Sequence, residues 1–316
     1  MNNQVSTWEA LLPDHVDIVE VGPRDGFQNL VDFIDTSDKV TIIESLISAG
    51  IKRMEVTSFV HPKAVPQMRD AGDVMTRIKR GGCECFAMAP NLIGAERAIE
   101  AGTDMLNLVV SASDTHNNSN VRMTVEESLN SFVPVFELAE QTGTAVRASV
   151  ATSFGCPFEG DVPLNRLLNV CARLVAMGCI ELNPCDTTGM ANPRQVAVVA
   201  RELTEAFGDD VAITMHFHNT RGAGPANLLA ALQNGVTSFE SSLGGLGGCP
   251  FAPGATGNVC TEDMVHMLHE MEIDTGIDLE RLLEAVKEAE ERMQLTFPGQ
   301  VIKAGLVDDL HQGCGA

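Results

Sequence analysis

The sequence predicts an α/β protein of the (β/α)8 type, the TIM barrel, with an extra helical segment at its C-terminal end. Eight strand-like runs alternate with helical patterns at a spacing of about 30 residues, which is typical of a closed barrel of parallel strands. Several helical patterns end in Ala-Gly, Met-Gly or Asn-Gly directly before the next strand-like run. Glycine in this position ends a helix, so each helix is expected to return the chain to the start of the next strand.

The predicted elements follow one another along the whole chain. The first strand is Asp17-Ile-Val-Glu-Val and the second is Arg53-Met-Glu-Val-Thr, with a helical pattern over 37–48 between them. The later strands and their helices are 83–88 with 95–101, 105–110 with 125–141, 145–151 with 164–177, 179–183 with 193–207, 211–217 with 225–233, and 235–241 with a helix from about 261. A further helix over 279–293 lies beyond the eighth unit.

The repeated unit predicts one catalytic domain over residues 1–316. Its barrel spans about 17–270, and a C-terminal helical extension spans about 275–316. A doubly wound sheet is the alternative architecture. The first strand is followed by no Gly-x-Gly-x-x-Gly motif and no linker divides the chain, and both features favour the barrel.

Composition excludes several classes of function. The 316 residues carry 43 acidic and 21 basic side chains, a net charge of −22 that repels nucleic acid and anionic lipid. No run approaches the roughly 18 apolar residues of a membrane span, and the N-terminus carries no signal-like pattern. Nine scattered cysteines suit reduced thiols better than a disulfide framework. We therefore expect a cytoplasmic enzyme without a nucleic-acid or membrane partner.

The segment Met215-His-Phe-His-Asn carries two imidazoles two positions apart at the end of a strand-like run. Alternation along a strand places His216 and His218 on one face, where they can supply two coordination positions to a divalent metal. Taken alone, the pair is more readily explained by two polar residues on the solvated face of an edge strand.

The barrel prediction brings other polar residues to the same place, because active sites of such barrels lie at the C-terminal ends of the strands. Taken singly, each of these residues or motifs has an ordinary structural explanation. Arg24-Asp25 can be a surface ion pair or part of a turn, and Glu55 can pair with a base inside the barrel. The glycine-rich loop can be a hinge or a phosphate cradle, although it lacks the lysine of a P-loop. Together they place one carboxylate, two imidazoles and one amide on one rim, a donor set that suits an octahedral divalent ion. The candidates are Arg24, Asp25 and Gln28 after strand one, Glu55 on strand two, Asp186 after strand six, and Cys249 and Asn258 in the glycine-rich loop after strand eight.

The sequence also resembles the 3-hydroxy-3-methylglutaryl-CoA lyase family over residues 17 to 270. The resemblance rests on the motifs Val19-Glu-Val-Gly-Pro-Arg-Asp-Gly-Phe-Gln-Asn, Gly155-Cys-Pro-Phe-Glu-Gly, His216-Phe-His-Asn-Thr and Gly244-Gly-Leu-Gly-Gly-Cys-Pro. The Arg-Asp and His-x-His elements also occur in isopropylmalate and homocitrate synthases and in biotin carboxyltransferase domains. The Gly-Gly-Cys-Pro loop favours the lyases.

The resemblance implies specific roles. Asp25, His216, His218 and Asn258 match the metal ligands, with Mg²⁺ or Mn²⁺ as the expected ion. Arg24 matches the arginine that stabilises the enolate. Cys249 matches the loop thiol that transfers a proton. Glu55 and Asp186 match acidic residues near the reacting carbons. The implied reaction is retro-Claisen cleavage of an acyl-CoA substrate to acetyl-CoA and acetoacetate. His216 is expected to take part in catalysis as well as in metal binding.

Some positions depart from the family pattern. The family has Asp and Tyr where this chain has Asn219 and Arg221, and Phe158 and Phe251 replace tyrosines. Arg221 is expected either to contact a substrate carboxylate or CoA phosphate or to form a structural pair. These departures leave open a lyase for a differently branched 3-hydroxyacyl-CoA, and a condensing enzyme of the same superfamily is the other alternative.

The remaining expectations concern substrate contacts and assembly. Gln28, Ser113 and Arg221 lie on predicted rim loops and are expected to bind substrate. We also expect a homo-oligomer, a dimer. The C-terminal Cys314 is similar to a cysteine that links subunits in some lyases of the family, although a lone surface thiol without a role is the slightly preferred explanation.

Overall fold

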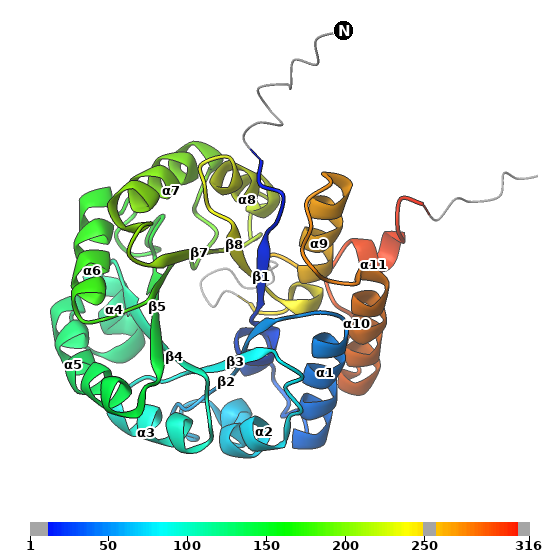
Figure 1. Ribbon diagram of the computed structural model, residues 1–316, viewed down its shortest axis with the longest axis horizontal. Coiled ribbons are helices and arrows are strands. Elements are labelled where there is room, and N and C mark those ends of the chain that lie inside the picture. Colours follow the sequence, from blue (N-terminus) through cyan, green and yellow to red (C-terminus); the bar gives the residue numbers. More distant parts are fainter. Residues whose placement is uncertain (1–11, 249–256, 309–316) are drawn as a thin grey trace, which may run out of the picture.

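The computed structural model describes residues 12–248 and 257–308, and there the chain forms a closed barrel of parallel strands inside a ring of helices (Figure 1). Each strand pairs with the next, and β8 closes the barrel against β1. The strands are β1 (Asp17–Glu20), β2 (Arg53–Ser58), β3 (Glu84–Met88), β4 (Met105–Ser111), β5 (Ala145–Ala151), β6 (Glu181–Asp186), β7 (Ala212–Phe217) and β8 (Ser238–Ser241). The predicted barrel is confirmed.

The helices lie outside the strands, so the apolar side chains of both pack into one core between the two layers. Their bounds are α1 (Thr36–Ser48), α2 (Ala71–Arg77), α3 (Leu92–Glu100), α4 (Asp114–Val121), α5 (Val125–Thr142), α6 (Leu164–Ala176), α7 (Pro193–Phe207), α8 (Gly224–Leu232), α9 (Thr261–Glu270), α10 (Leu279–Met293) and α11 (Val301–Ala304). Within the described ranges, none of these helices is both long and apolar enough to cross a bilayer.

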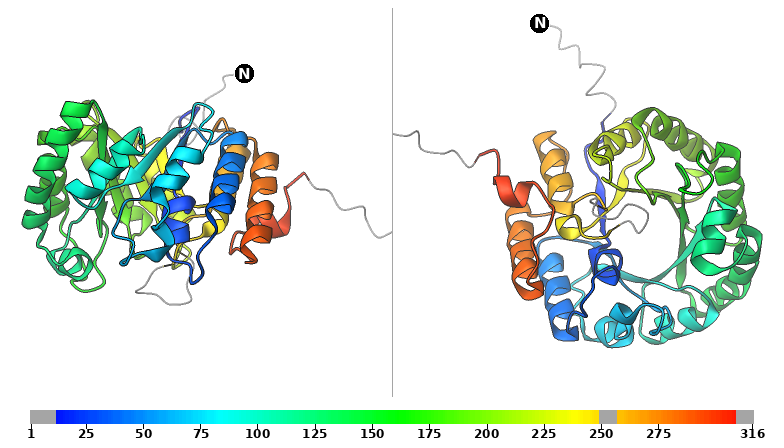
Figure 2. Two further views of the ribbon diagram at one scale, coloured as in Figure 1. Left: turned by 90° about the horizontal axis from the view of Figure 1, so that it is seen from below. Right: turned by 180° about the vertical axis from the view of Figure 1, so that it is seen from behind.

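The predicted C-terminal helical segment is present as α10 and α11, outside the ring. Both Figure 1 and Figure 2 show α10 beside α1. The backbone N–H of Asp278, just before α10, donates to the carbonyl of Ala49 after α1 at 2.8 Å, and Ser45 on α1 donates to Glu288 at 2.8 Å. The segment therefore packs against the helix that follows the first strand.

Two strands begin later than predicted, for one shared reason. The sixth starts at Glu181 rather than at Cys179, and the eighth starts at Ser238 rather than at 235. The N–H of Cys179 still donates to Leu174 in α6 at 3.1 Å, and the N–H of Val236 donates to Ala231 in α8 at 3.2 Å. These residues follow a glycine in the left-handed region and complete the helix end before the strand begins.

The helix α4 was missed because its sequence, Asp-Thr-His-Asn-Asn-Ser-Asn-Val, consists mostly of weak helix formers. Local hydrogen bonds hold it instead. Ser113 caps its first turn by accepting from the N–H of His116, and buried Asn117 accepts from the N–H of Ser111 at 3.0 Å. The Asn117 amide also donates to the carbonyl of Met123 at 2.8 Å. These contacts stabilise a segment that propensity alone disfavours.

The interior of the barrel contains charged side chains. Arg53 on β2 forms an ion pair with Glu181 on β6, a strand on the opposite side of the barrel. Arg147 on β5 is fully buried and also contacts Glu181. Because a buried ion must be paired, this layer of opposite charges is stable only as a set.

A buried ion pair outside the barrel gives the first testable prediction, on stability. Lys39 on α1 lies 2.6 Å from Asp70, with 4% and 7% of the two side chains exposed. Replacing Lys39 by methionine removes the partner of a buried carboxylate and is expected to lower the free energy of unfolding by about 3–5 kcal/mol, measured by urea denaturation. The matched control is Lys79→Met, because Lys79 is 89% exposed in its pair with Glu44. Equal stability losses in both variants would contradict the prediction.

Candidate metal centre

The structure brings Asp25, His216 and His218 together at the rim of the barrel. One ligand atom from each lies within 4.8 Å of the other two. Asp25 lies in a π-helical turn, Gly22–Gly26, directly after β1, and the histidines lie at the end of β7. Both histidines are 6% exposed, and their ring centroids are 5.0 Å apart. The spacing of this group and the burial of its two histidines would suit a metal ion.

Asn258 completes the group from the other side. Its amide nitrogen donates to Asp25 Oδ2 at 2.7 Å and to the carbonyl of Leu246 at 3.0 Å, so both amide hydrogens are used. Its Oδ1 is buried and accepts no hydrogen bond among the described residues. A buried acceptor without a donor is rare, and a cation beside Asp25 would satisfy it.

A glycine allows the loop backbone to come close to Asn258 and Asp25. Gly247 has φ of +109°, in the region that side chains rarely adopt. A Cβ there would overlap the amide nitrogen of Asn258 and would lie 3.4 Å from Asp25 Oδ2. The backbone of the glycine-rich loop can therefore lie directly against the group formed by Asp25, His216, His218 and Asn258, which we call the candidate ligand group.

The protonation states also fit a cation. Burial lowers the pKa of His218 to about 3, with His216 adding to the effect, so His218 is neutral at physiological pH. Burial raises the pKa of Asp25, but Arg24 and His216 outweigh it and hold that pKa below the ordinary value. A neutral imidazole and an ionised carboxylate are the forms in which these groups bind metal.

Arg24 links the ligand group to the acidic side chain of β2. Its Nη1 donates to Asp25 Oδ1 at 2.7 Å, and its Nε forms a short hydrogen bond with Glu55. Glu55 also accepts from Asn107 at 2.7 Å and is fully buried. Of the alternatives that the sequence left open for Glu55, pairing with a neighbouring base is the one that the structure shows.

Asp186 lies at the end of β6, and only one of its two carboxylate oxygens accepts hydrogen bonds from described residues. Oδ1 accepts from the N–H of Met190 at 2.7 Å and of Ala191 at 3.1 Å, whereas Oδ2 is buried and has no partner among the described residues. Burial raises the pKa of Asp186 to about 6. Such a group can exchange a proton near neutral pH.

Arg221 holds the turn that follows Asp186. Its Nη1 donates to the carbonyls of Thr188 and Gly189, both at 2.8 Å. Asn219, which stands where the family has Asp, accepts from the N–H of Gly224 at 3.1 Å, at the start of α8. The two departures from the family pattern thus make contacts with loop and helix backbone.

Buried polar atoms without a partner collect on this side of the barrel. Most of those among the described residues lie on or after β6, β7 and β8, where a substrate or water would have to satisfy them. Among them are the Asn183, Asp186, Thr188, Thr220, Ser242 and Asn258 oxygens and His218 Nδ1.

Of the other predicted residues, one lies beside the metal-ligand candidates, others lie elsewhere, and some fall outside the described residues. Gln28 donates to Asp25 Oδ1 at 2.9 Å and so adjoins the ligand group. Ser113 is fully buried, donates to Glu159 at 2.7 Å and lies 3.0 Å from the Cys156 thiol. Phe158 is 47% exposed. The positions predicted at Cys249, Phe251 and Cys314 lie outside the described residues.

Sequence reasoning missed Glu240, whose Oε2 lies 2.8 Å from His216 Nδ1. Burial lowers the pKa of His216, but the hydrogen bond to Glu240 outweighs it and raises that pKa above its ordinary value. Alternation along Ser238-Phe-Glu-Ser places Glu240 on the same face as Ser238, which is a usable signal only once the register of β8 against β7 is known.

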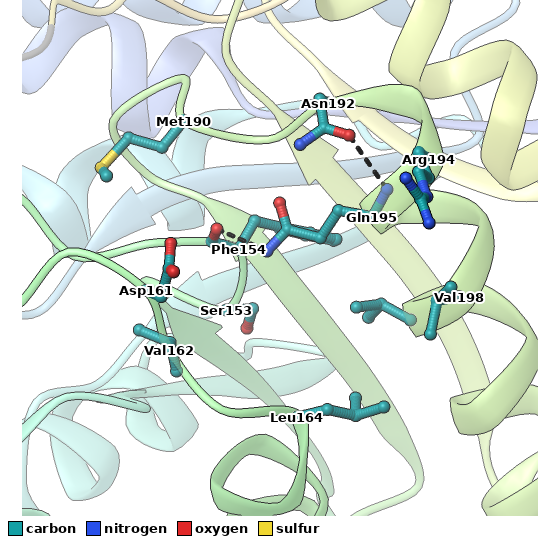
Figure 3. Close-up of a pocket in the computed structure, with 11 residues that line it drawn as sticks. Ser153, Phe154, Asp161, Val162, Leu164, Met190, Asn192, Arg194, Gln195 and Val198 are labelled. Carbon is teal, nitrogen blue, oxygen red and sulfur yellow. Dashed lines mark hydrogen bonds between the residues drawn. The ribbon is translucent and has the colours of Figure 1, made fainter.

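A cavity of about 490 Å³ lies next to the turn after β6 rather than at the ligand group. It is lined by residues around the first turns of α6 and α7, among them Leu164, Met190 and Arg194. Figure 3 shows the Gln195 amide bonded to the carbonyl of Phe154 beside it. None of the predicted site residues lines this cavity, so the chemistry is assigned to the ligand group instead.

Comparisons with known proteins find relatives that match most of the chain. A family model described as HMGL-like matches residues 15–288. The chain is 45% identical over 289 residues to the hydroxymethylglutaryl-CoA lyase YngG of Bacillus subtilis, an alignment that covers 91% of this chain and 96% of that protein.

Two further similarities concern the acyl group and CoA. The chain is 41% identical to a 3-hydroxy-3-isohexenylglutaryl-CoA/hydroxymethylglutaryl-CoA lyase of Pseudomonas aeruginosa, over 87% of this chain and 91% of the relative. The fold of this chain matches that of an HMG-CoA lyase from Acinetobacter baumannii solved with coenzyme A and 3-methylmalate. The TM-score of that match is 0.90, with 42% identity over 95% of this chain and 98% of the other.

Proposed function

The chain belongs to the HMGL-like family, and from that premise we propose that it is a metal-dependent carbon–carbon lyase acting on 3-hydroxy-3-methylglutaryl-CoA or a close analogue. The products are acetyl-CoA and a 3-keto acid, acetoacetate for the methylglutaryl substrate. The observation that carries the proposal is the group of Asp25 with the two buried histidines His216 and His218. Arg24 is hydrogen-bonded to this group, and the unpartnered Oδ1 of Asn258 lies beside it.

The ion that these four donors would hold is Mg²⁺ or Mn²⁺. Two oxygen and two nitrogen donors leave room in an octahedral shell for substrate oxygens. When bound, a divalent ion supplies Lewis acidity that favours ionisation of the 3-hydroxyl group of the substrate.

Asp186 is the proposed base for the proton of that hydroxyl. Its Oδ2 is free to accept, and the N–H groups of Met190 and Ala191 hold the other oxygen in place. Cleavage of the C2–C3 bond then leaves the negative charge of an enolate on the thioester oxygen. Arg24 is the proposed partner for that charge, because its buried guanidinium is already fixed by Glu55 and Asp25.

Protonation of the enolate carbon completes the reaction. We propose the Cys249 thiol as the proton donor on the strength of the sequence motif, since this residue lies outside the described ranges. Gln28, Ser113 and Arg221 remain proposed substrate contacts. Each now donates to a protein acceptor and would have to exchange it for a substrate oxygen.

A panel of thioesters tests the reaction and its acyl group. With saturating Mn²⁺, the purified protein is expected to release acetyl-CoA from 3-hydroxy-3-methylglutaryl-CoA or from a substrate with a longer 3-substituent, measured by chromatography. The relative from P. aeruginosa is named for both acyl groups, which supports including the longer one. Release of no acetyl-CoA from any member of the panel would rule out the proposed lyase.

The pH dependence of turnover tests the base. Asp186 is active in its ionised form, so kcat/KM is expected to fall about tenfold per pH unit on the acidic side of its pKa and to level off above it. That pKa is about 6 in the metal-free protein, and a cation bound at the neighbouring histidines would lower it. Arg221 lowers the pKa of Asp186, so Arg221→Gln is expected to move this acidic limb to higher pH. The profile should be measured at saturating metal. A limb that Arg221→Gln leaves in place or moves to lower pH would contradict the assignment.

Location and assembly are further parts of the proposal. All seven cysteines among the described residues are free thiols, which supports a reducing, cytoplasmic environment. The expected homodimer can be measured by light scattering.

A further inference from the structure

We propose that Glu240 is a positioning residue that fixes the ring of His216 and its tautomer, and that Arg147 holds Glu240 in place from inside the barrel. The inference rests on the metal centre of the proposed function and assigns roles to two buried residues that the reaction itself does not use. It identifies a set of contacts that runs from the barrel interior to one metal ligand.

The contact between Glu240 and His216 determines which nitrogen faces the metal site. His216 and Glu240 are register partners on the adjacent strands β7 and β8, and both are buried. With Nδ1 2.8 Å from Glu240 Oε2, the Nδ1–H donates to the carboxylate and Nε2 keeps its lone pair. A carboxylate acceptor also makes Nε2 a stronger donor to a cation.

Arg147 contacts the other carboxylate oxygen of Glu240, Oε1. Its Nη2 lies 2.9 Å from Glu240 Oε1 and 3.1 Å from Glu181 Oε1, and its guanidinium lies 4.8 Å from the ring centroid of Phe86. The Arg147 nitrogens and Glu240 Oε1 lack hydrogen-bond geometry, so the contact is ionic rather than directional. A permanently charged, fully buried arginine keeps both carboxylates ionised and close to it.

Glu181, the second carboxylate beside Arg147, is held by side chains from β2 and β7. Glu181 forms an ion pair with Arg53 and accepts from Thr214 at 2.8 Å, and Thr214 also lies 2.8 Å from Ser238. Arg147 therefore has two carboxylate neighbours, of which only Glu240 contacts His216. This difference supplies a matched control for the experiment.

The test compares Glu240→Gln with Glu181→Gln in the full-length protein. Loss of an outer partner of a metal-bound histidine costs about 10- to 100-fold in metal affinity. Glu240→Gln is therefore expected to raise the Kd for Mn²⁺, measured by electron paramagnetic resonance, by that factor. Glu181→Gln is expected to bind Mn²⁺ with an affinity close to that of the wild-type protein. Circular dichroism and thermal unfolding report whether each variant is folded.

A second readout needs neither metal nor a stable variant. Nitrogen-15 spectra of the histidine rings, recorded on the metal-free wild-type protein at a pH above the raised pKa of His216, are expected to show a neutral His216 ring with the proton on Nδ1. A proton on Nε2, or equal Mn²⁺ affinities in Glu240→Gln and the wild type, or equal losses in both variants, would overturn the inference. If the wild-type protein itself bound no Mn²⁺, the proposed metal centre would fail instead, so the two failures are distinguishable.

Discussion

Replacing Arg24 by methionine is expected to lower kcat by about 10²- to 10³-fold, the range found when one fixed donor to a developing oxyanion is removed. Arg24 is 8% exposed, and its guanidinium is held by Asp25 and Glu55, so it needs no reorganisation when negative charge develops on the thioester oxygen. Charge stabilisation in such a dry site exceeds that in water. Steady-state acetyl-CoA release measures the effect.

Arg24→Lys is the informative companion. Lysine keeps the charge but cannot make the two divergent contacts of the guanidinium fork, so its kcat is expected to lie between those of the wild type and Arg24→Met. Mn²⁺ affinity should be measured in both variants, because Arg24 also contacts the proposed ligand Asp25. A kcat in Arg24→Met within threefold of the wild type would show that Arg24 does not stabilise the transition state.

Replacing His218 by alanine is expected to weaken Mn²⁺ binding by more than the roughly 100-fold that loss of an outer partner costs. His218 is a neutral buried imidazole, and its Nδ1 has no partner among the described residues. Its removal therefore leaves no buried charge unpaired, and metal binding is expected to suffer more than folding. Electron paramagnetic resonance measures the affinity, and urea denaturation measures the stability.

The matched control for His218→Ala is His116→Ala. His116 is also a buried imidazole, 5% exposed, but it lies in α4 and bonds to Ser111 at 2.6 Å. Both variants lose a similar volume of buried ring, and only His218→Ala is expected to lose Mn²⁺. Similar affinities for Mn²⁺ in the two variants would show that His218 is not a ligand.

The barrel, and the grouping of most of the candidate ligands on one rim, could be predicted from the sequence because the signals are local. Alternation placed His216 and His218 on one face, and the strand-helix repeat placed Asp25 and Asn258 on the same rim. The starts of β6 and β8 could not be predicted, since Cys179 and Val236 still bond to the preceding helix. That contact depends on helix-end geometry rather than on composition.

The contacts that orient the proposed metal ligands could not be predicted from the sequence, for a different reason. Glu240 meets His216 through the register of β7 against β8, and Arg147 reaches Glu240 only after the barrel closes. A glutamate in a strand carries no local sign of such a partner. Similarly, the free oxygen of Asp186 follows from the turn that supplies the N–H groups of Met190 and Ala191.

The central claim is that the group at Asp25, His216, His218 and Asn258 holds the divalent ion of a carbon–carbon lyase. The most direct test titrates metal-free protein with Mn²⁺ while recording both ion occupancy and acetyl-CoA release from the best thioester of the panel. We predict that EDTA-treated protein is inactive and that occupancy and turnover rise together to one bound ion per chain. Full turnover of the metal-free protein, or occupancy that rises without turnover, would contradict the claim.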